Sequence, residues 1–83
     1  MAWEAMTSHR KRFPQAIEFG HRVRARRHEL GWSIETLADN SGLHWTYVGS
    51  VERGERNVAL LNIVRLAAAL QMDAAELVRG IIP

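Results

Sequence analysis

The chain has 83 residues, which allow a single domain, and 47% of them are hydrophobic, which excludes a disordered tail as the dominant state. It has no cysteine, no apolar run long enough to span a membrane, and charged residues where a secretion signal would need its apolar core. The formal net charge is only +2, but seven of the eleven Arg and Lys residues lie between Arg10 and Arg27, where Glu18 is the only acid.

This uneven distribution of charge leaves two interpretations open. A locally basic face suits an anionic partner such as nucleic acid. The same arginines would also be normal on a solvated helix surface, and charge alone does not separate the two. Because the sequence has neither a membrane span nor a secretion signal, we expect a cytoplasmic protein.

Residues 1–14 form a short N-terminal segment without a regular hydrophobic period. Its basic stretch, Arg10 to Arg12, either reaches DNA as an arm or frays as an ordinary terminus, and both interpretations stay open. The folded domain is expected to comprise residues 15–83.

The first helix of this domain is expected over residues 15–30. Pro14 suits the first position of a helix, and Gly31 suits a left-handed cap at its end. Gly20 lies inside this helix, where it weakens the helix by about 1 kcal/mol relative to alanine. Such a cost is tolerable where a second helix must approach closely, so we expect a close contact at this position.

Two further helices are expected on either side of a tight turn. Ser33 is a preferred N-cap residue, and Gly42 can take the positive φ that the turn requires. The next helix runs over residues 44–53, where Val48 and Val51 are spaced to face inward. The remaining side chains of that helix are left for its outer side.

The C-terminal part is expected to form two more helices. Residues 59–70 are so apolar that we expect them to form the central buried helix, with Asn57 as its cap. Asp73, with Glu76 three residues later, indicates the start of a last helix that ends near Gly80. No segment alternates with the period of a strand, so the predicted fold class is all-α, with five short helices.

Four residues, Ala38, Gly42, Val48 and Val51, have the spacing that is typical of a helix-turn-helix. Ala38 supplies the small residue where two helices cross, Gly42 the glycine of the turn, and Val48 and Val51 the apolar anchors of the second helix. Longer motifs extend this pattern: R-A-R-R-x-x-L-G-W-S at 24–33, L-A-x-x-S-G-L at 37–43, V-E-R-G-E-R-N at 51–57, L-x-x-I-V-R-L-A-x-A-L at 60–70, and the segment 73–77. In order and register they resemble the lambda-repressor-like (Cro/XRE) helix-turn-helix family, over roughly 60 residues. The stretch Tyr47–Asn57 is also similar to the controller proteins of restriction-modification systems.

The resemblance implies a compact five-helix domain whose third helix lies in the major groove of DNA, which is about 12 Å wide and accepts one α-helix. It implies base or groove-edge contacts from His44, Trp45, Thr46, Tyr47 and Ser50. It implies phosphate contacts from Ser33, Arg53, Arg56 and Asn57. It also implies a largely buried ion pair between Arg27 and Glu52 that fixes the angle of the third helix; the alternative is that both side chains are solvated.

The chain departs from the family pattern at two positions. Ile34 stands where glutamine is common, and Trp45 where a small or hydrogen-bonding residue is usual. An indole offers one N–H and a flat apolar surface, so contact with a thymine methyl group or a sugar is more plausible than bidentate base reading. A place for Trp45 or Tyr47 at the edge of the core stays open as well, and Trp32 is expected to pack as a hydrophobic staple.

No grouping of residues predicts catalysis or metal binding. There is no serine, histidine and acid grouping, and no glycine-rich phosphate loop after a strand. The histidines His9, His21, His28 and His44 are expected to be surface residues. Only His21 and His28 share the first helix, and no third residue nearby would complete a metal site with them. We therefore expect no enzyme activity, no cofactor and no metal.

Together these observations predict a sequence-specific DNA-binding transcriptional regulator, such as a repressor, that acts as a homodimer on a palindromic operator. A single short module buries little DNA surface, so two copies are expected. The expected dimer surface is the apolar chain end with one residue of the fourth helix: Leu77, Val78, Ile81 and Ile82, together with Leu61. The alternative is a protein-binding module such as an antitoxin. We expect no membrane partner and no small-molecule effector.

Overall fold

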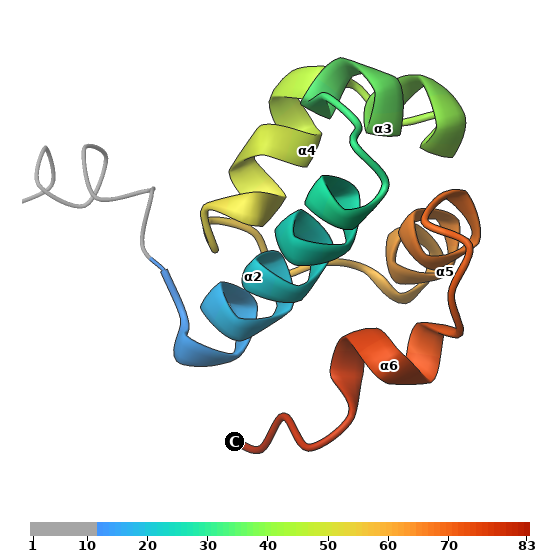
Figure 1. Cartoon of the computed structure of the whole chain (residues 1–83). Helices are drawn as coiled ribbons and strands as arrows, with labels where there is room; N and C mark the ends of the chain where they lie inside the picture. The colour runs from blue at the N-terminus through green and yellow to red at the C-terminus, as the bar shows by residue number, and fades with distance from the viewer. Residues whose placement is uncertain (1–11) are drawn as a thin grey trace, which may run out of the picture.

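The computed structural model describes residues 12–83, so most of the expected N-terminal segment lies outside the described residues. Five α-helices follow one another along the chain (Figure 1): α2 (Pro14–Glu29), α3 (Ile34–Ser41), α4 (Trp45–Glu52), α5 (Leu60–Ala69) and α6 (Ala74–Val78). Residues 12–83 contain no strand, which confirms the all-α fold class, and each helix boundary lies within two residues of its expected position. No described helix is long and apolar enough to cross a membrane.

Local sequence determines where the helices begin. In three cases the residue before the helix accepts a hydrogen bond from a backbone N–H of the first turn: Ser33 for α3, His44 for α4 and Asp73 for α6. The N-cap of α5 is Ala59, and no side chain caps that helix. The expectation that Asn57 caps α5 is therefore wrong.

The helices form two groups on either side of α2. In Figure 1, α2 crosses the middle of the molecule, with α3 and α4 on one side and α5 and α6 on the other. Helix α2 packs against both α4 and α6, while α3 packs against α4 and α5. Every helix contributes to one core, which contains Phe19, Val23, Leu37, Ala38, Val48, Val51, Leu66, Ala67, Leu70 and Leu77.

The expectation that α5 is the central buried helix is wrong, because the most buried helix is α4, where Val48 to Glu52 are all buried. Only Leu66 and Ala67 are buried within α5. Its outer face carries three large apolar side chains, Leu60, Leu61 and Val64, with exposed fractions of 76%, 60% and 48%. Because α5 lies at the periphery and packs against α3 and α6, this face has no cover within the described chain.

Helices α2 and α4 meet at Gly20, as the sequence predicted. A Cβ atom at this position would overlap the backbone carbonyl oxygen of Val51 and would lie 2.7 Å from that of Glu52. No flexible side chain is involved, so nothing can move aside without shifting the backbone of α4. The missing side chain at Gly20 therefore sets the distance between these helices.

Replacing Gly20 with alanine should destabilise the domain. In an open helix this change would stabilise by about 1 kcal/mol, because glycine has the poorer helix propensity. Here the overlap with α4 should outweigh that gain by about 1–3 kcal/mol and lower the melting temperature. Thermal denaturation followed by circular dichroism measures the sign, and a higher melting temperature for G20A would contradict the close packing.

Candidate nucleic-acid interface

The two faces of α4 differ sharply. Val48 and Val51 point into the core and are fully buried, whereas His44, Trp45 and Thr46 are exposed. Val48 and Val51 lie three residues apart and share the inner side of the helix, whereas His44 is the N-cap and Trp45 and Thr46 belong to the first turn. The start of α4 therefore presents three consecutive side chains to solvent.

Hydrogen bonds at the N-terminus of α4 fix the polar character of two of these side chains. The Nδ1 atom of His44 accepts a hydrogen bond from the backbone N–H of Thr46 (3.1 Å) and lies 2.6 Å from the Thr46 hydroxyl. Because Nδ1 accepts, a neutral His44 carries its proton on Nε2. In this tautomer His44 presents its Nε2–H toward solvent, and the Thr46 hydroxyl oxygen keeps a lone pair that can accept a hydrogen bond.

Trp45 lies on the outer side of α4 and not in the core. Its exposed fraction is 54%, and its ring stacks on that of His44 with 5.8 Å between centroids and 26° between planes. The stacking holds the indole as a flat apolar surface next to the polar groups of His44 and Thr46. Of the two places that the sequence left open for Trp45, the structure shows the exposed one.

Ser50 does not lie on the exposed face, contrary to expectation. Its exposed fraction is 5%, and its hydroxyl donates to the carbonyl oxygen of Tyr47 at 2.7 Å and accepts from Nε of Arg56 at 3.0 Å. Both hydrogen-bonding roles of the hydroxyl are occupied, so Ser50 supports Arg56 instead of facing outward.

Tyr47 is half-buried and links α4 to α5. Its hydroxyl accepts a hydrogen bond from Nδ2 of Asn62 at 3.1 Å, and the guanidinium of Arg56 lies 5.6 Å from the centre of its ring. Asn62 was not among the residues predicted from the sequence. Its signal was weak, because a lone polar residue in the apolar stretch 60–70 fits a solvated position equally well.

The residues expected to contact phosphate lie at two ends of the helix-turn-helix. Ser33 caps α3 by accepting from the N–H of Thr36 at 3.1 Å, which leaves the N–H groups of Ile34 and Glu35 without a helical partner. Arg53 and Arg56 are exposed after α4, and so is Asn57. Arg53 pairs with Glu55 through its Nε atom at 3.1 Å.

Arg27 and Glu52 form the expected ion pair between α2 and α4. Nε and Nη2 of Arg27 donate to the two carboxylate oxygens at 2.7 and 2.9 Å, and both side chains are buried. Nη1 donates to the carbonyl oxygen of Trp32 at 2.8 Å. The hydrogen bonds to Glu52 raise the pKa of Arg27 against the lowering effect of burial, so the guanidinium stays charged at any ordinary pH.

Two other arginines of α2 are structural, which the sequence analysis did not anticipate. Arg22 donates through Nη1 to the carbonyl oxygen of Arg79 at 2.7 Å, at the end of α6. Arg26 donates through Nε to the carbonyl oxygen of Leu70 at 2.9 Å, at the end of α5. Their spacing of four residues, beside the buried Phe19 and Val23, was the available signal that both border the core.

The apolar chain end divides between the core and the surface. Leu77 is fully buried in the core, so its expected place in a dimer surface is wrong. Val78 and Ile82 are exposed and Ile81 is half-buried. Because α6 packs against α2, the inward side chain Leu77 is buried in the core of its own chain.

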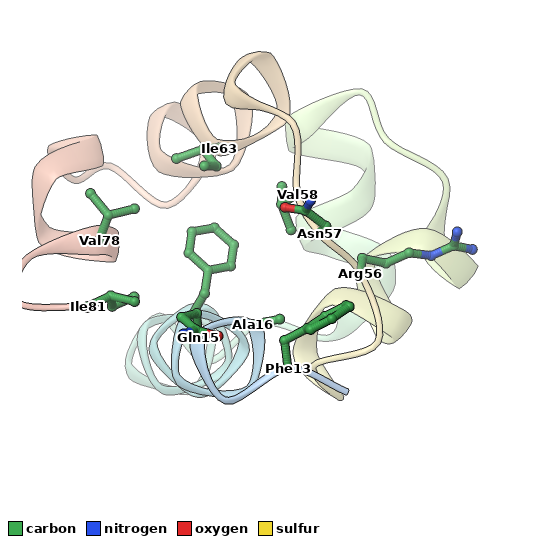
Figure 2. A pocket seen from close by; sticks show the side chains of 10 residues that line it. Phe13, Gln15, Ala16, Arg56, Asn57, Val58, Ile63, Val78 and Ile81 are labelled. Carbon is green, nitrogen blue, oxygen red and sulfur yellow. The ribbon is translucent and has the colours of Figure 1, made fainter. Parts of the chain in front are cut away.

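An open groove of about 410 Å³ lies between the start of α2, the segment after α4, and helices α5 and α6 (Figure 2). Phe13, Ile63, Val78 and Ile81 line it, and Figure 2 shows the Arg56 side chain directed away from it. Residues 12–83 hold no group of three or more His, Cys, Asp or Glu side chains arranged to bind a metal.

Replacing Arg27 with methionine should leave the Glu52 carboxylate buried without a partner. Removing one member of a buried pair costs about 3–5 kcal/mol, so R27M should lose much of its folding free energy. Urea denaturation measures this loss. The double variant R27M/E52L is the control, because it removes both charges and should recover most of the stability; an R27M protein as stable as the wild type would contradict the structural role of the pair.

Comparison with known proteins identifies relatives for most of this domain. A helix-turn-helix family profile matches residues 23–77. The control protein C.SmaI of Serratia marcescens is 51% identical over 55 residues, which are 66% of this chain and 66% of that protein. A hypothetical transcription factor of Neisseria meningitidis is 47% identical over 57 residues, 69% of this chain and 54% of that protein. The chain thus spans between half and two thirds of the length of these two relatives.

The crystal structure of the restriction-modification controller protein C.AhdI from Aeromonas hydrophila has the same fold. It superposes with a TM-score of 0.76 at 51% sequence identity, over 78% of this chain and 98% of that chain. The match to the family profile includes α3, the turn at Gly42 and α4, which carry the exposed face described above. The chain belongs to the helix-turn-helix family, of the Cro/XRE type that its motifs resemble.

Proposed function

We propose that this protein is a sequence-specific DNA-binding transcriptional regulator that reads the major groove with α4. The observation that carries the proposal is the exposed start of α4, where His44, Trp45 and Thr46 stand side by side on a helix whose opposite face is fixed in the core. A single α-helix fits the major groove, which is about 12 Å wide.

The names of the relatives support the same function. C.SmaI is named a control protein, C.AhdI a restriction-modification controller protein, and the Neisseria relative a hypothetical transcription factor. On this basis a regulator of the restriction-modification controller kind is the specific form of the proposal.

The polar character of the exposed residues indicates what they would read. His44 Nε2 and the Trp45 indole are donors, whereas the Thr46 hydroxyl oxygen is an acceptor. Donors match N7 and O6 of guanine or O4 of thymine, and the flat indole matches a thymine methyl group. Ser33, Arg53, Arg56 and Asn57 would hold the backbone phosphates on either side, and the N–H groups at the start of α3 would add to them.

Selection of bound duplexes from a random DNA pool tests this function directly. We expect enrichment of one sequence, and binding to it should weaken steeply with salt because phosphate contacts release counterions. An unenriched pool would refute sequence-specific binding.

Replacing Trp45 with alanine should weaken binding to the selected duplex by about 1–2 kcal/mol, roughly tenfold, with little effect on a random duplex. The melting temperature should hardly change, because the side chain is largely exposed. Trp45→Phe is the matched control: it keeps a flat apolar ring and lacks the N–H, so it separates apolar contact from hydrogen bonding. Fluorescence anisotropy measures both affinities, and equal loss on both duplexes would contradict a role in sequence reading.

The regulator is proposed to act as a homodimer on a palindromic site. One domain of this size offers few base contacts, and two copies would place two α4 helices in successive major grooves about 34 Å apart. The outer face of α5 is the favoured contact, because it groups three exposed large apolar side chains, Leu60, Leu61 and Val64, on one helix. Val78, Ile81 and Ile82 form the second candidate surface.

Replacing Leu61 with aspartate should convert a dimer into monomers, because a buried unpaired carboxylate is costly. Analytical ultracentrifugation measures the association. Asn40→Asp, which adds a charge on the exposed side of α3, should remain dimeric. If Ile82→Asp dissociates the dimer and Leu61→Asp does not, the contact lies at the chain end instead of α5.

A protein-binding module, such as an antitoxin, is the second candidate function, and the exposed apolar face of α5 favours it. An apolar protein contact depends little on salt, whereas DNA binding weakens steeply with it. A selection without enrichment, together with salt-independent capture of a protein partner, would favour this alternative.

A further inference from the structure

A basic cleft of about 340 Å³ lies between α2 and α4. Arg24 and His21 line it from α2, Gly49 from α4, Arg53 from the residue after α4, and Arg12 from the residues before α2. Arg12, His21, Arg24 and Arg53 are all exposed, so their polar ends can reach a solvent-borne group.

The cleft carries an excess of positive charge that is not paired within the fold. Of the four arginines of α2, three are occupied by hydrogen bonds to Glu52 or to the ends of α5 and α6, as described above. Arg24 has no hydrogen-bond or ion-pair partner among residues 12–83. The carboxylate of Glu52 also lines the cleft, but Arg27 already pairs with both its oxygens, and Glu55 shares Arg53.

The cleft lies on the side of α4 that begins at Trp45. Gly49, which is buried, and the C-cap residue Arg53 follow Trp45 at intervals of four residues, so all three lie along that side. Ile34, the first residue of α3, also lines the cleft. An α-helix with its side chains is about 10–12 Å across and fills a major groove of similar width, so elements beside it come against the DNA backbone.

The geometry points to a phosphate-binding site in this cleft, with Arg24 as the principal cation and a DNA backbone phosphate as the ligand. This inference rests on the proposed function. It adds a DNA contact from α2 to the proposed DNA contacts of α3, of α4 and of the residues after α4. A phosphate bound here positions the protein on the duplex and carries no base preference.

The test is Arg24→Gln in the full chain, because glutamine keeps the helix propensity and removes the charge. Affinity for the selected duplex and for a random duplex is measured by anisotropy over a series of salt concentrations. R24Q should weaken both by the same factor and reduce the slope of log K against log salt by about 0.9, the value for one phosphate. Arg79→Gln, at an exposed position after α6 and outside the cleft lining, is the matched control and should keep the wild-type slope.

Each outcome decides between the two proposals. An R24Q slope equal to that of the wild type and of R79Q overturns the phosphate site and leaves DNA binding intact. A wild-type protein that binds neither duplex overturns the proposed function and this site with it. Inorganic phosphate alone is titrated as a second arm and followed by the amide NMR shifts of Arg24 and Gly49. Saturable shifts without a change in the R24Q slope would assign the cleft to free phosphate and overturn the DNA contact.

Discussion

Arg27 ties the helix-turn-helix to α2 at both of its ends. Its guanidinium donates to Trp32, which precedes the N-cap of α3, and to Glu52, the last residue of α4. Taking these charges out of water costs several kcal/mol each, and only the paired arrangement offsets that cost. Among residues 12–83 no buried side-chain polar atom lacks a partner. The ion pair therefore selects one orientation of α4, and the close approach at Gly20 fixes its distance from α2.

The arginines of α2 divide between structure and solvent according to the helical period. Arg22 and Arg26 lie one turn apart and reach the ends of α6 and α5, while Arg27 turns toward α4. Arg24 is left on the exposed side. Arginine suits the internal positions because its planar group offers five donors to several carbonyl and carboxylate oxygens at once. A basic stretch in a sequence is thus a poor measure of the charge that remains for a partner.

Much of the fold could be predicted because residues next to each helix end determine where that helix begins or stops. Ser33, Gly31 and Gly42 mark helix ends by their own chemistry, and the spacing of Val48 and Val51 gives the inner face of α4. The ion pair of Arg27 and Glu52 could be predicted only from the family resemblance. The two residues are 25 positions apart, and no local pattern in the sequence connects them.

The errors arise where tertiary contacts decide. The burial of Ser50 depends on an arginine six residues away in a loop, which no helical period describes. The apolar content of residues 59–70 gives the amount of hydrophobic surface but not its cover, so of the exposed face of α5 only Leu61 was predicted. The position of Leu77 could not be predicted for the same reason. An apolar residue at the chain end can pack in the core of its own chain or against a second copy equally well.

The capping of α6 by Arg22 bears on how the domain opens. A helix of five residues is far below the length at which helices persist in water. It is retained by the burial of Leu77 and by the hydrogen bonds from Arg22 to the carbonyl oxygens of Glu76 and Arg79. Leu77 lies in the core shared by the helices, and the Arg22 hydrogen bonds come from α2, so α6 cannot fray without opening the core. Its amide protons should therefore exchange with solvent in the same cooperative step as those of α2, which makes this shortest helix part of the most protected unit of the domain.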